Sequence, residues 1–276
     1  MTEPPLSFRA TLDAALKELE AGPPSPERLE EWTARLREAA QRELGDPLRA
    51  EDQVRFAFET IYRRLVDQGK VVRYVPGVPR YTIEMVKPKL RAELDRRVAA
   101  SVDLIKYNRA EAVDRTVRRF AGWASAVPPG GAEVDLTEAR KLARDDLAKY
   151  KYHRRLVQND QGHKLIANVS EITAAGAGAV AGKWNSHFRD ASYDARRDHA
   201  ARDGKYYVLR DSWAYQQGLI TKGAGFYDEI TAAGEEINCR CWVTWVSSLR
   251  NLPPDMLTTK GREWVKAGDE RARRFA

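Results

Sequence analysis

The feature that most constrains the fold of this chain is a long apolar stripe between residues 90 and 120. Charged residues occupy most positions between its members, which are Leu90, Leu94, Val98, Val102, Ile105, Val113, Val117 and Phe120. A repeat of about 3.6 residues places such side chains on one face of an α-helix. The stripe therefore predicts one long amphipathic helix, which the prolines and glycines of residues 128–131 end.

Shorter apolar repeats predict further helices on both sides of this stripe. They are carried by Leu12, Leu16 and Leu19, by Leu29, Trp32 and Leu36, by Val54, Phe58, Ile61 and Leu65, and by Leu136, Ala139, Ala143, Leu147 and Tyr150. Asp135 with Glu138 resembles an N-cap and its reciprocal acid. Residues 71–83 carry β-branched and aromatic residues around Pro-Gly, which predicts a hairpin or a short extended pair. The small-residue run at 174–182 predicts either a glycine-rich loop or a close helix contact.

The sequence changes character after Gly204. Residues 205–213 and 239–248 are rich in β-forming residues, and the segment between them reads as a long loop. We expect an α+β, mostly α fold, in which a helical N-terminal region precedes a small C-terminal α+β domain containing a short sheet. The expected domains are residues 1–130, residues 131–248 and a polar tail, 249–276, with a short helix expected around Arg262 to Phe275.

The balance of charge is modestly basic, with 47 Lys and Arg against 40 Asp and Glu. This excess favours contact with polyanions such as DNA, although a solvated surface of mixed charge gives the same balance. A candidate basic helix face comprises Lys141, Arg144, Lys149, Lys151, Arg154 and Arg155. No stretch approaches the roughly 18 apolar residues that a membrane span needs, and the first residues do not form a secretory signal. We expect a protein of the cytoplasm, or of a particle assembled there.

Four separated pieces in the second half carry the most specific pattern. In order, they are Asn159-Asp160-Gln161 with Lys164, then Lys183-Trp184, then Arg196 to His199 with Asp203-Gly204, and last Asn238-Cys239-Arg240-Cys241. Over roughly residues 140–247 they resemble the Mu F-like minor head protein domain of tailed bacteriophages and prophages. The residues that carry this resemblance are Asp160, Gln161, Lys164, Trp184, Arg196, His199, Gly204, Asn238, Cys239, Arg240 and Cys241.

The resemblance implies a minor capsid protein for head morphogenesis, and not an enzyme. Its implied partners are the portal protein, through residues 1–130, the major capsid or scaffold protein, and packaged DNA through non-specific phosphate contacts. Its implied location is the virion, in the head interior or at the portal vertex, and the host cytoplasm during assembly. Head assembly, genome packaging and genome delivery all remain open as roles.

Two other function classes stay open. A phage nuclease would need paired carboxylates, for which Asp160 and Asp194 are the candidates, but no acidic cluster surrounds them. A delivery domain related to polymorphic toxins is the other class, because Mu F-like domains can be fused to toxins. Arg196, Arg197 and Arg240 could bind phosphate, or could pair with nearby acids such as Asp198 and Asp203.

The two cysteines lie two residues apart, which places Cys239, Cys241, Val243 and Trp245 on one face of a strand. In one reading this face is a buried structural anchor, the cysteines pack as small apolar groups, and His199 hydrogen-bonds a backbone carbonyl. No cofactor is then needed. In the other reading His199, Cys239 and Cys241 bind zinc, and Asp190, Asp194 or water supplies a fourth ligand.

Overall fold

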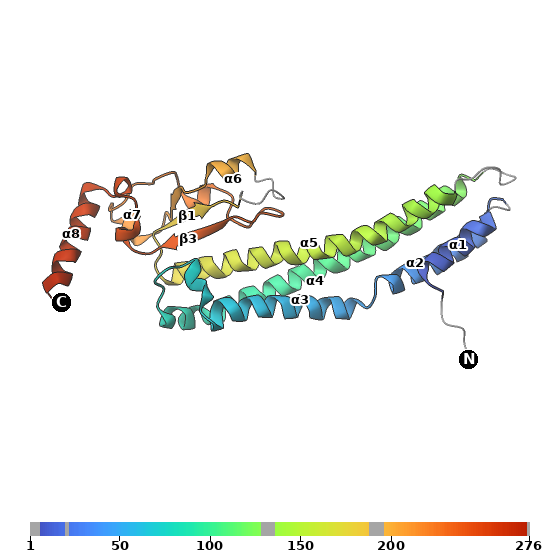
Figure 1. The fold of residues 1–276 in the computed structure, drawn as a ribbon, viewed down its shortest axis with the longest axis horizontal. Coiled ribbons are helices and arrows are strands. Elements are labelled where there is room, and N and C mark those ends of the chain that lie inside the picture. Colours follow the sequence, from blue (N-terminus) through green and yellow to red (C-terminus); the bar gives the residue numbers. More distant parts are fainter. Residues whose placement is uncertain (1–5, 20–21, 128–135, 188–195, 275–276) are drawn as a thin grey trace. The chain divides into compact units, whose positions relative to one another are not determined.

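The computed structural model describes residues 6–19, 22–127, 136–187 and 196–274, and the mostly α, α+β fold class is confirmed. The longer helices are α1 (Phe8–Leu19), α2 (Pro26–Glu43), α3 (Pro47–Tyr62), α4 (Arg80–Ser125), α5 (Leu136–Gly176) and α8 (Thr259–Arg274), and the short ones are α6 (Arg197–Ala201) and α7 (Trp213–Gln216) (Figure 1). The strands are β1 (Ala181–Asn185), β2 (Tyr206–Val208) and β3 (Trp242–Val246). No helix in these ranges has an apolar stretch long enough to cross a membrane.

The apolar stripe of residues 90–120 is buried along α4, as its spacing predicts. All eight of its members are at most 9% exposed. Leu12, Leu16 and Leu19 of α1 are buried in the same way, and so are Ala143 and Leu147 of α5. The proline-glycine break at 128–131 and the expected N-cap Asp135 lie outside the described residues.

The chain divides into two compact units, each made from two stretches of sequence. The first unit comprises residues 1–55 and 99–158, and the second comprises residues 56–98 and 159–276. Helices α3, α4 and α5 therefore contribute to both units. The domain boundaries expected at residues 130 and 248 stay predictions, because compactness does not measure which segments fold independently.

In the first unit, the helices are joined by side chains that reach backbone and carboxylate oxygens. Arg109 of α4 donates to the carbonyl oxygens of Gln41 and Gly45, at 2.7 and 2.6 Å. Arg119 of α4 lies 3.3 Å from Asp146, a carboxylate of α5 that is only 5% exposed. Apolar stripes set which helix faces meet, and these polar contacts fix their alignment.

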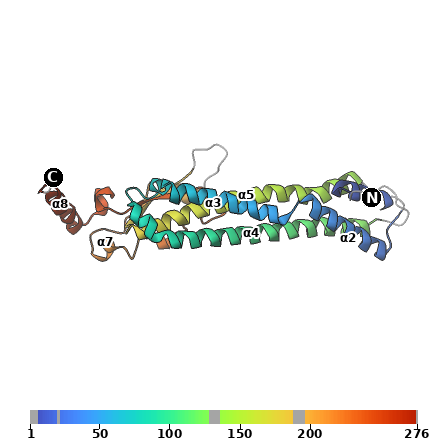
Figure 2. The ribbon, with the colours of Figure 1, turned by 90° about the horizontal axis from the view of Figure 1, so that it is seen from below.

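In the second unit, α4 and α5 run antiparallel and side by side, as both ribbon views show (Figures 1 and 2). The carboxylate of Glu93 on α4 accepts from Asn168 on α5 at 2.6 Å, and also from Arg96 and Arg97. A Cβ added at Gly176 would lie 2.5 Å from Val86 Cγ1. The small-residue run thus provides a close helix contact at its start, before the chain turns into β1.

The hairpin expected at residues 71–83 is wrong. Residues Lys70–Arg73 form a 3-10 helix, a turn follows, and α4 begins at Arg80. Val71 and Val75 are both fully buried, and the Val75 N–H donates to the Val71 carbonyl at 3.0 Å. Residues four positions apart lie on the same side of a helical turn, so Val71 and Val75 are buried together. A strand would instead bury every second residue.

The small sheet is antiparallel, with strand order β2-β1-β3. Gly182 of β1 faces Tyr207 of β2 and Trp245 of β3. A Cβ at Gly182 would lie 2.5 Å from a Val243 methyl carbon, so only glycine fits there without movement. The other face packs on an apolar core that includes Ala181, Val208 and Val246.

The segment expected to be a polar tail contributes to that core. Leu249, Leu252 and Met256 are each at most 6% exposed and belong to the same cluster as Val208 and Val246. The last helix, α8, extends a few residues further toward the N-terminus than the sequence pattern indicated. After Met256, Leu257 and Val265 still pack against this cluster, while most of the other residues of α8 are polar.

Candidate functional site: a buried histidine between two cysteines

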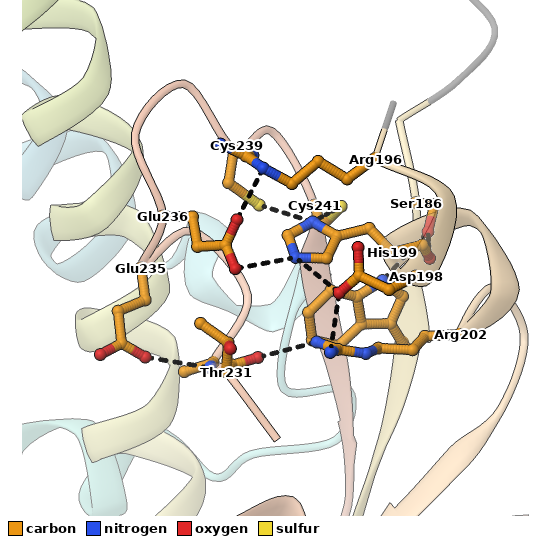
Figure 3. Close-up of polar contacts among 12 residues, drawn as sticks. Ser186, Arg196, Asp198, His199, Arg202, Thr231, Glu235, Glu236, Cys239 and Cys241 are labelled. Atoms are coloured by element: carbon orange, nitrogen blue, oxygen red, sulfur yellow. Dashed lines mark hydrogen bonds and ion pairs between the residues drawn. The ribbon is translucent and has the colours of Figure 1, made fainter. Parts of the chain in front are cut away.

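The candidate site is a cluster of His199, Cys239 and Cys241 in the second unit. The short helix α6 presents the ring of His199, and the chain leading into β3 presents the two cysteines. The Nδ1 atom of His199 lies 3.5 Å from Cys239 Sγ and 3.7 Å from Cys241 Sγ (Figure 3). The three residues are 1%, 1% and 5% exposed. Their ligand atoms lie within 4.8 Å of one another, so the group could hold a metal ion.

The alternation expected from Cys239 to Trp245 is confirmed by burial, because Cys239, Cys241, Val243 and Trp245 are all buried. The secondary structure differs in one respect: β3 begins at Trp242, so both cysteines lie in the loop that leads into the strand. In the sheet, β1 lies between β2 and β3, so these two strands do not pair with each other.

The far side of the histidine ring faces two carboxylates. His199 Nε2 lies 3.7 Å from Glu236 Oε1 and 3.8 Å from Asp198 Oδ2, as Figure 3 shows. Glu236 is held by Arg196, whose Nε donates at 2.7 Å, and Asp198 is held by Arg202 at 3.0 Å. Nε2 itself is buried and has no hydrogen-bond partner within the described residues. Among the described residues, the His199 ring therefore does not form the expected hydrogen bond to a backbone carbonyl.

Trp184 of β1 and Ser186, which directly follows this strand, support the histidine. The Trp184 ring meets the His199 ring edge-on, with centroids 5.3 Å apart. Trp184 Nε1 donates to Ser186 Oγ at 3.0 Å, and Ser186 Oγ donates to the backbone carbonyl of His199 at 2.5 Å. The Arg202 guanidinium lies over the same indole at 5.1 Å. Because Trp184 is fully buried, these contacts fix the position of α6 against the sheet.

A second group of signature residues anchors the loop before the cysteines. Asp160 of α5 is 8% exposed, and its Oδ1 accepts from the backbone N–H of Asn238 at 2.7 Å. Its Oδ2 lies 2.9 Å from Lys164 Nζ and accepts from Gln161 at 3.2 Å. Asn238 adopts a left-handed backbone conformation, with φ 60°. The carboxylate thus ties a strained turn to the long helix.

The electrostatics of the two sulfurs are strongly asymmetric. The Cys241 thiol donates to Cys239, and this bond is the main reason that the pKa of Cys239 is lowered, while burial acts in the opposite direction. The backbone N–H of Gly234 also donates to Cys239 Sγ, at 3.4 Å. The same thiol bond, together with burial, raises the pKa of Cys241. The hydrogen bond between the cysteines thus acts on their two pKa values in opposite directions.

Within the part of the chain that the structure describes, the remaining candidate residues offer no ligand atom to the cluster. Gly204 forms a turn with φ 74° between α6 and β2. Arg240 is exposed, and its charge adds to burial in lowering the pKa of His163 on α5. Arg197 is exposed as well. Asp190 and Asp194, the expected sources of a fourth ligand, lie outside the described residues.

Sequence reasoning did not find the role of Glu236. It lies three residues before Cys239 in a segment that reads as loop, so no periodicity marks it. Arg196 was expected to bind phosphate or to pair with neighbouring aspartates, and Glu236 is the acid that it pairs with. An arginine and a carboxylate separated by 40 positions carry no local signal of their contact.

Chemically, the cluster offers three nitrogen and sulfur ligands in a buried setting, with carboxylates behind the imidazole. Protein-family models, curated proteins and solved structures give no match to this chain. The likeness to Mu F-like minor head proteins therefore rests on the motif residues themselves.

Proposed function

We propose that this chain is a minor head protein of a tailed bacteriophage, a structural component of head morphogenesis and not an enzyme. The observation that carries the proposal is the meeting of the four motif pieces in one buried network. Asp160 holds Asn238, Trp184 packs on His199, and His199 lies between the two cysteines. These residues come from four segments that are distant in the sequence and meet in the fold. Their meeting supports the view that the four motif pieces are the signature of one structural domain.

The network has the character of a scaffold. Trp184, His199 and Cys239 are at most 1% exposed, so their side chains do not face solvent where a substrate would arrive. The Asp160 carboxylate, which a nuclease would need for a metal, is engaged by Lys164 and by the Asn238 N–H. This engagement favours the structural reading over a DNA-processing enzyme. A delivery domain related to polymorphic toxins would use the same scaffold, and only its fusion partner would differ.

Association with the portal protein is the first test. We expect the full chain, co-expressed with the portal protein of the same genome, to co-purify with it through residues 1–130. Tyr107 on α4 is 63% exposed and lies in this stretch, while Tyr152 on α5 is 54% exposed and lies outside it. Tyr107→Asp should weaken the complex and Tyr152→Asp should not. No complex at micromolar concentration and low salt would contradict the proposal.

Non-specific DNA contact is the second part of the proposal. At about 100° per residue, Lys141, Arg144, Lys151 and Arg155 fall on one side of α5, and Lys149 and Arg154 fall outside it. Three of these four line a cleft of about 790 Å³ together with Arg9 and Arg140. Glu43 and Asp145 line it too, and Lys151 lies 3.3 Å from Glu43, so the cleft is basic but not purely so.

A gel-shift assay at two salt concentrations tests this contact. Binding should be independent of sequence and should weaken steeply as salt rises, with a log–log slope of about −0.9 per phosphate neutralised. Replacing Lys141 and Arg144 by Glu should reduce both affinity and slope, and Lys149→Glu should change them less. Salt-insensitive or sequence-selective binding would contradict phosphate contact.

The proposed location follows from these partners: the head interior or the portal vertex of the virion, and the host cytoplasm during assembly. Major capsid or scaffold protein would be further partners. Mass spectrometry of purified particles should find the chain at a few copies per portal, and its absence from particles would contradict a structural role. Within this function the buried His-Cys cluster serves stability rather than catalysis.

A further inference from the structure

We propose that His199, Cys239 and Cys241 bind a zinc ion, with Glu236 as the carboxylate that orients the histidine from behind. The inference goes beyond the function proposed above and does not depend on it. It concerns the stability and assembly of the second unit, whatever larger particle the chain belongs to.

The first argument is the spacing of the three ligand atoms. Zinc binds thiolate sulfur at about 2.3 Å and imidazole nitrogen at about 2.0 Å, so a tetrahedral site separates nitrogen from sulfur by about 3.6 Å. The two distances from His199 Nδ1 to sulfur are 3.5 and 3.7 Å. The two sulfurs thus lie at nearly equal distance from the nitrogen, as ligands of one shared ion would.

The second argument is the other ring nitrogen. If zinc binds Nδ1, the proton of the ring lies on Nε2, which then needs a hydrogen-bond acceptor. His199 Nε2 is buried and has no hydrogen-bond partner among the described residues. Glu236 Oε1 is 3.7 Å away, so a small movement of the carboxylate toward the ring completes the bond. Histidine ligands of zinc usually donate their second N–H to such an acceptor. Arg196 holds the far oxygen of Glu236 at 2.7 Å and so fixes the carboxylate in place.

The third argument is charge. Two thiolates and a neutral imidazole balance the two positive charges of zinc, so the loaded site carries no net charge into a buried position. The Gly234 N–H aimed at Cys239 Sγ provides one hydrogen bond to a thiolate. Soft thiolate and imidazole ligands in tetrahedral geometry favour zinc among the common divalent metals. Three ligands come from the described residues, and we assign the fourth position to water.

A zinc ion here would join two segments that have little regular structure of their own: α6, which has 5 residues, and the loop that leads into β3. A metal cross-link between them would add to the stability that the apolar core provides.

Metal analysis of the purified full chain is the first experiment. Prepared without chelators or a histidine tag, the wild-type protein should contain about one zinc per chain. His199→Ala, Cys239→Ser and Cys241→Ser should each lose it. His153→Ala, which removes an exposed histidine from α5, should keep it. Undiminished zinc in the cysteine variants would overturn the assignment, as would a different metal in the wild type.

Measurements on the wild type keep the proposal testable if a variant does not fold. Chelation should lower the melting temperature, and added zinc should restore it. Replacing zinc by cobalt should give an intense thiolate-to-cobalt charge-transfer band. Both cysteines should resist alkylation in the zinc form and react after chelation. No charge-transfer band, together with a melting temperature unaffected by chelation, would overturn the proposal.

The carboxylate is tested separately. Glu236→Gln keeps every ligand but weakens the acceptor for Nε2–H, and we expect zinc affinity, measured by competition with a chelator, to fall about 10- to 100-fold. Glu235→Gln is the matched control, because that neighbouring side chain is exposed and caps its own loop at the Ala232 N–H. Equal affinities for the two variants would remove Glu236 from the site.

Discussion

Asp160 offers the sharpest test of the network that joins α5 to the cysteine loop. Asp160→Ala removes the acceptor of the Asn238 N–H and the counter-charge of Lys164, two contacts of 2.7 and 2.9 Å. Lys164 is only 13% exposed at its side chain, so its charge cannot be fully rehydrated without movement.

The magnitude follows from these two contacts. A hydrogen bond to a charged group contributes about 1.5–3 kcal/mol, and a buried donor left without a partner costs about 1–3 kcal/mol. Lys164 can partly reach water, which reduces the loss, so we expect Asp160→Ala to lower the free energy of unfolding by about 3 kcal/mol. Asp160→Asn keeps an acceptor for Asn238 and loses the charge, and it should cost about half as much.

Urea unfolding followed by circular dichroism and by tryptophan fluorescence measures this loss. Coincidence of the two transitions is the condition for a single free energy, since the chain has two compact units. Asp95→Ala is the control: Asp95 is 56% exposed, pairs with Arg91 at 3.7 Å, and should cost less than about 0.5 kcal/mol. A loss for Asp160→Ala no larger than that of the control would refute the reasoning. So would a double-mutant cycle with Lys164→Met that shows no coupling.

Three further predictions concern the backbone and a buried carboxylate. Gly176→Ala should destabilise by about 1–3 kcal/mol because its Cβ would meet Val86, whereas Gly122→Ala, in open space within a helix, should stabilise by about 0.5–1 kcal/mol in thermal unfolding. Asn238→Ala should lower the free energy of unfolding by about 1 kcal/mol or more, since alanine tolerates φ 60° poorly. Asn238→Gly should leave this free energy unchanged in urea unfolding, because glycine adopts such a φ readily. Equal losses for the two variants would contradict the strain argument. Burial raises the pKa of Glu93, but bonds from three side chains outweigh it and lower the pKa below 4.5. The stability that ionised Glu93 adds over Glu93→Gln should therefore be complete at neutral pH and shrink as pH falls below about 4.5, where paired pH titrations of unfolding would detect it.

Much of the helical architecture could be predicted from the sequence, because helical periodicity is encoded in neighbouring residues. The stripe from Leu90 to Phe120 needs no knowledge of its partner to specify a buried face. The alternation from Cys239 to Trp245 likewise predicted a buried face, and it is buried. The same local reasoning failed at residues 71–83, where Val71 and Val75 are buried one helical turn apart in a segment with β-forming composition.

Only part of the candidate site could be predicted from the sequence. His199, Cys239 and Cys241 could be named from their residue types, but whether they meet depends on contacts across 40 and 42 positions. The carboxylate behind the ring, Glu236, has no periodic signal at all. Asp160 and Asn238 are separated by 78 positions, and their bond exists only once α5 and the loop are packed. The sequence by itself determined which faces are apolar, since that is a property of local spacing. The tertiary structure decided which of those faces and polar groups meet, because long-range contacts depend on how whole elements pack.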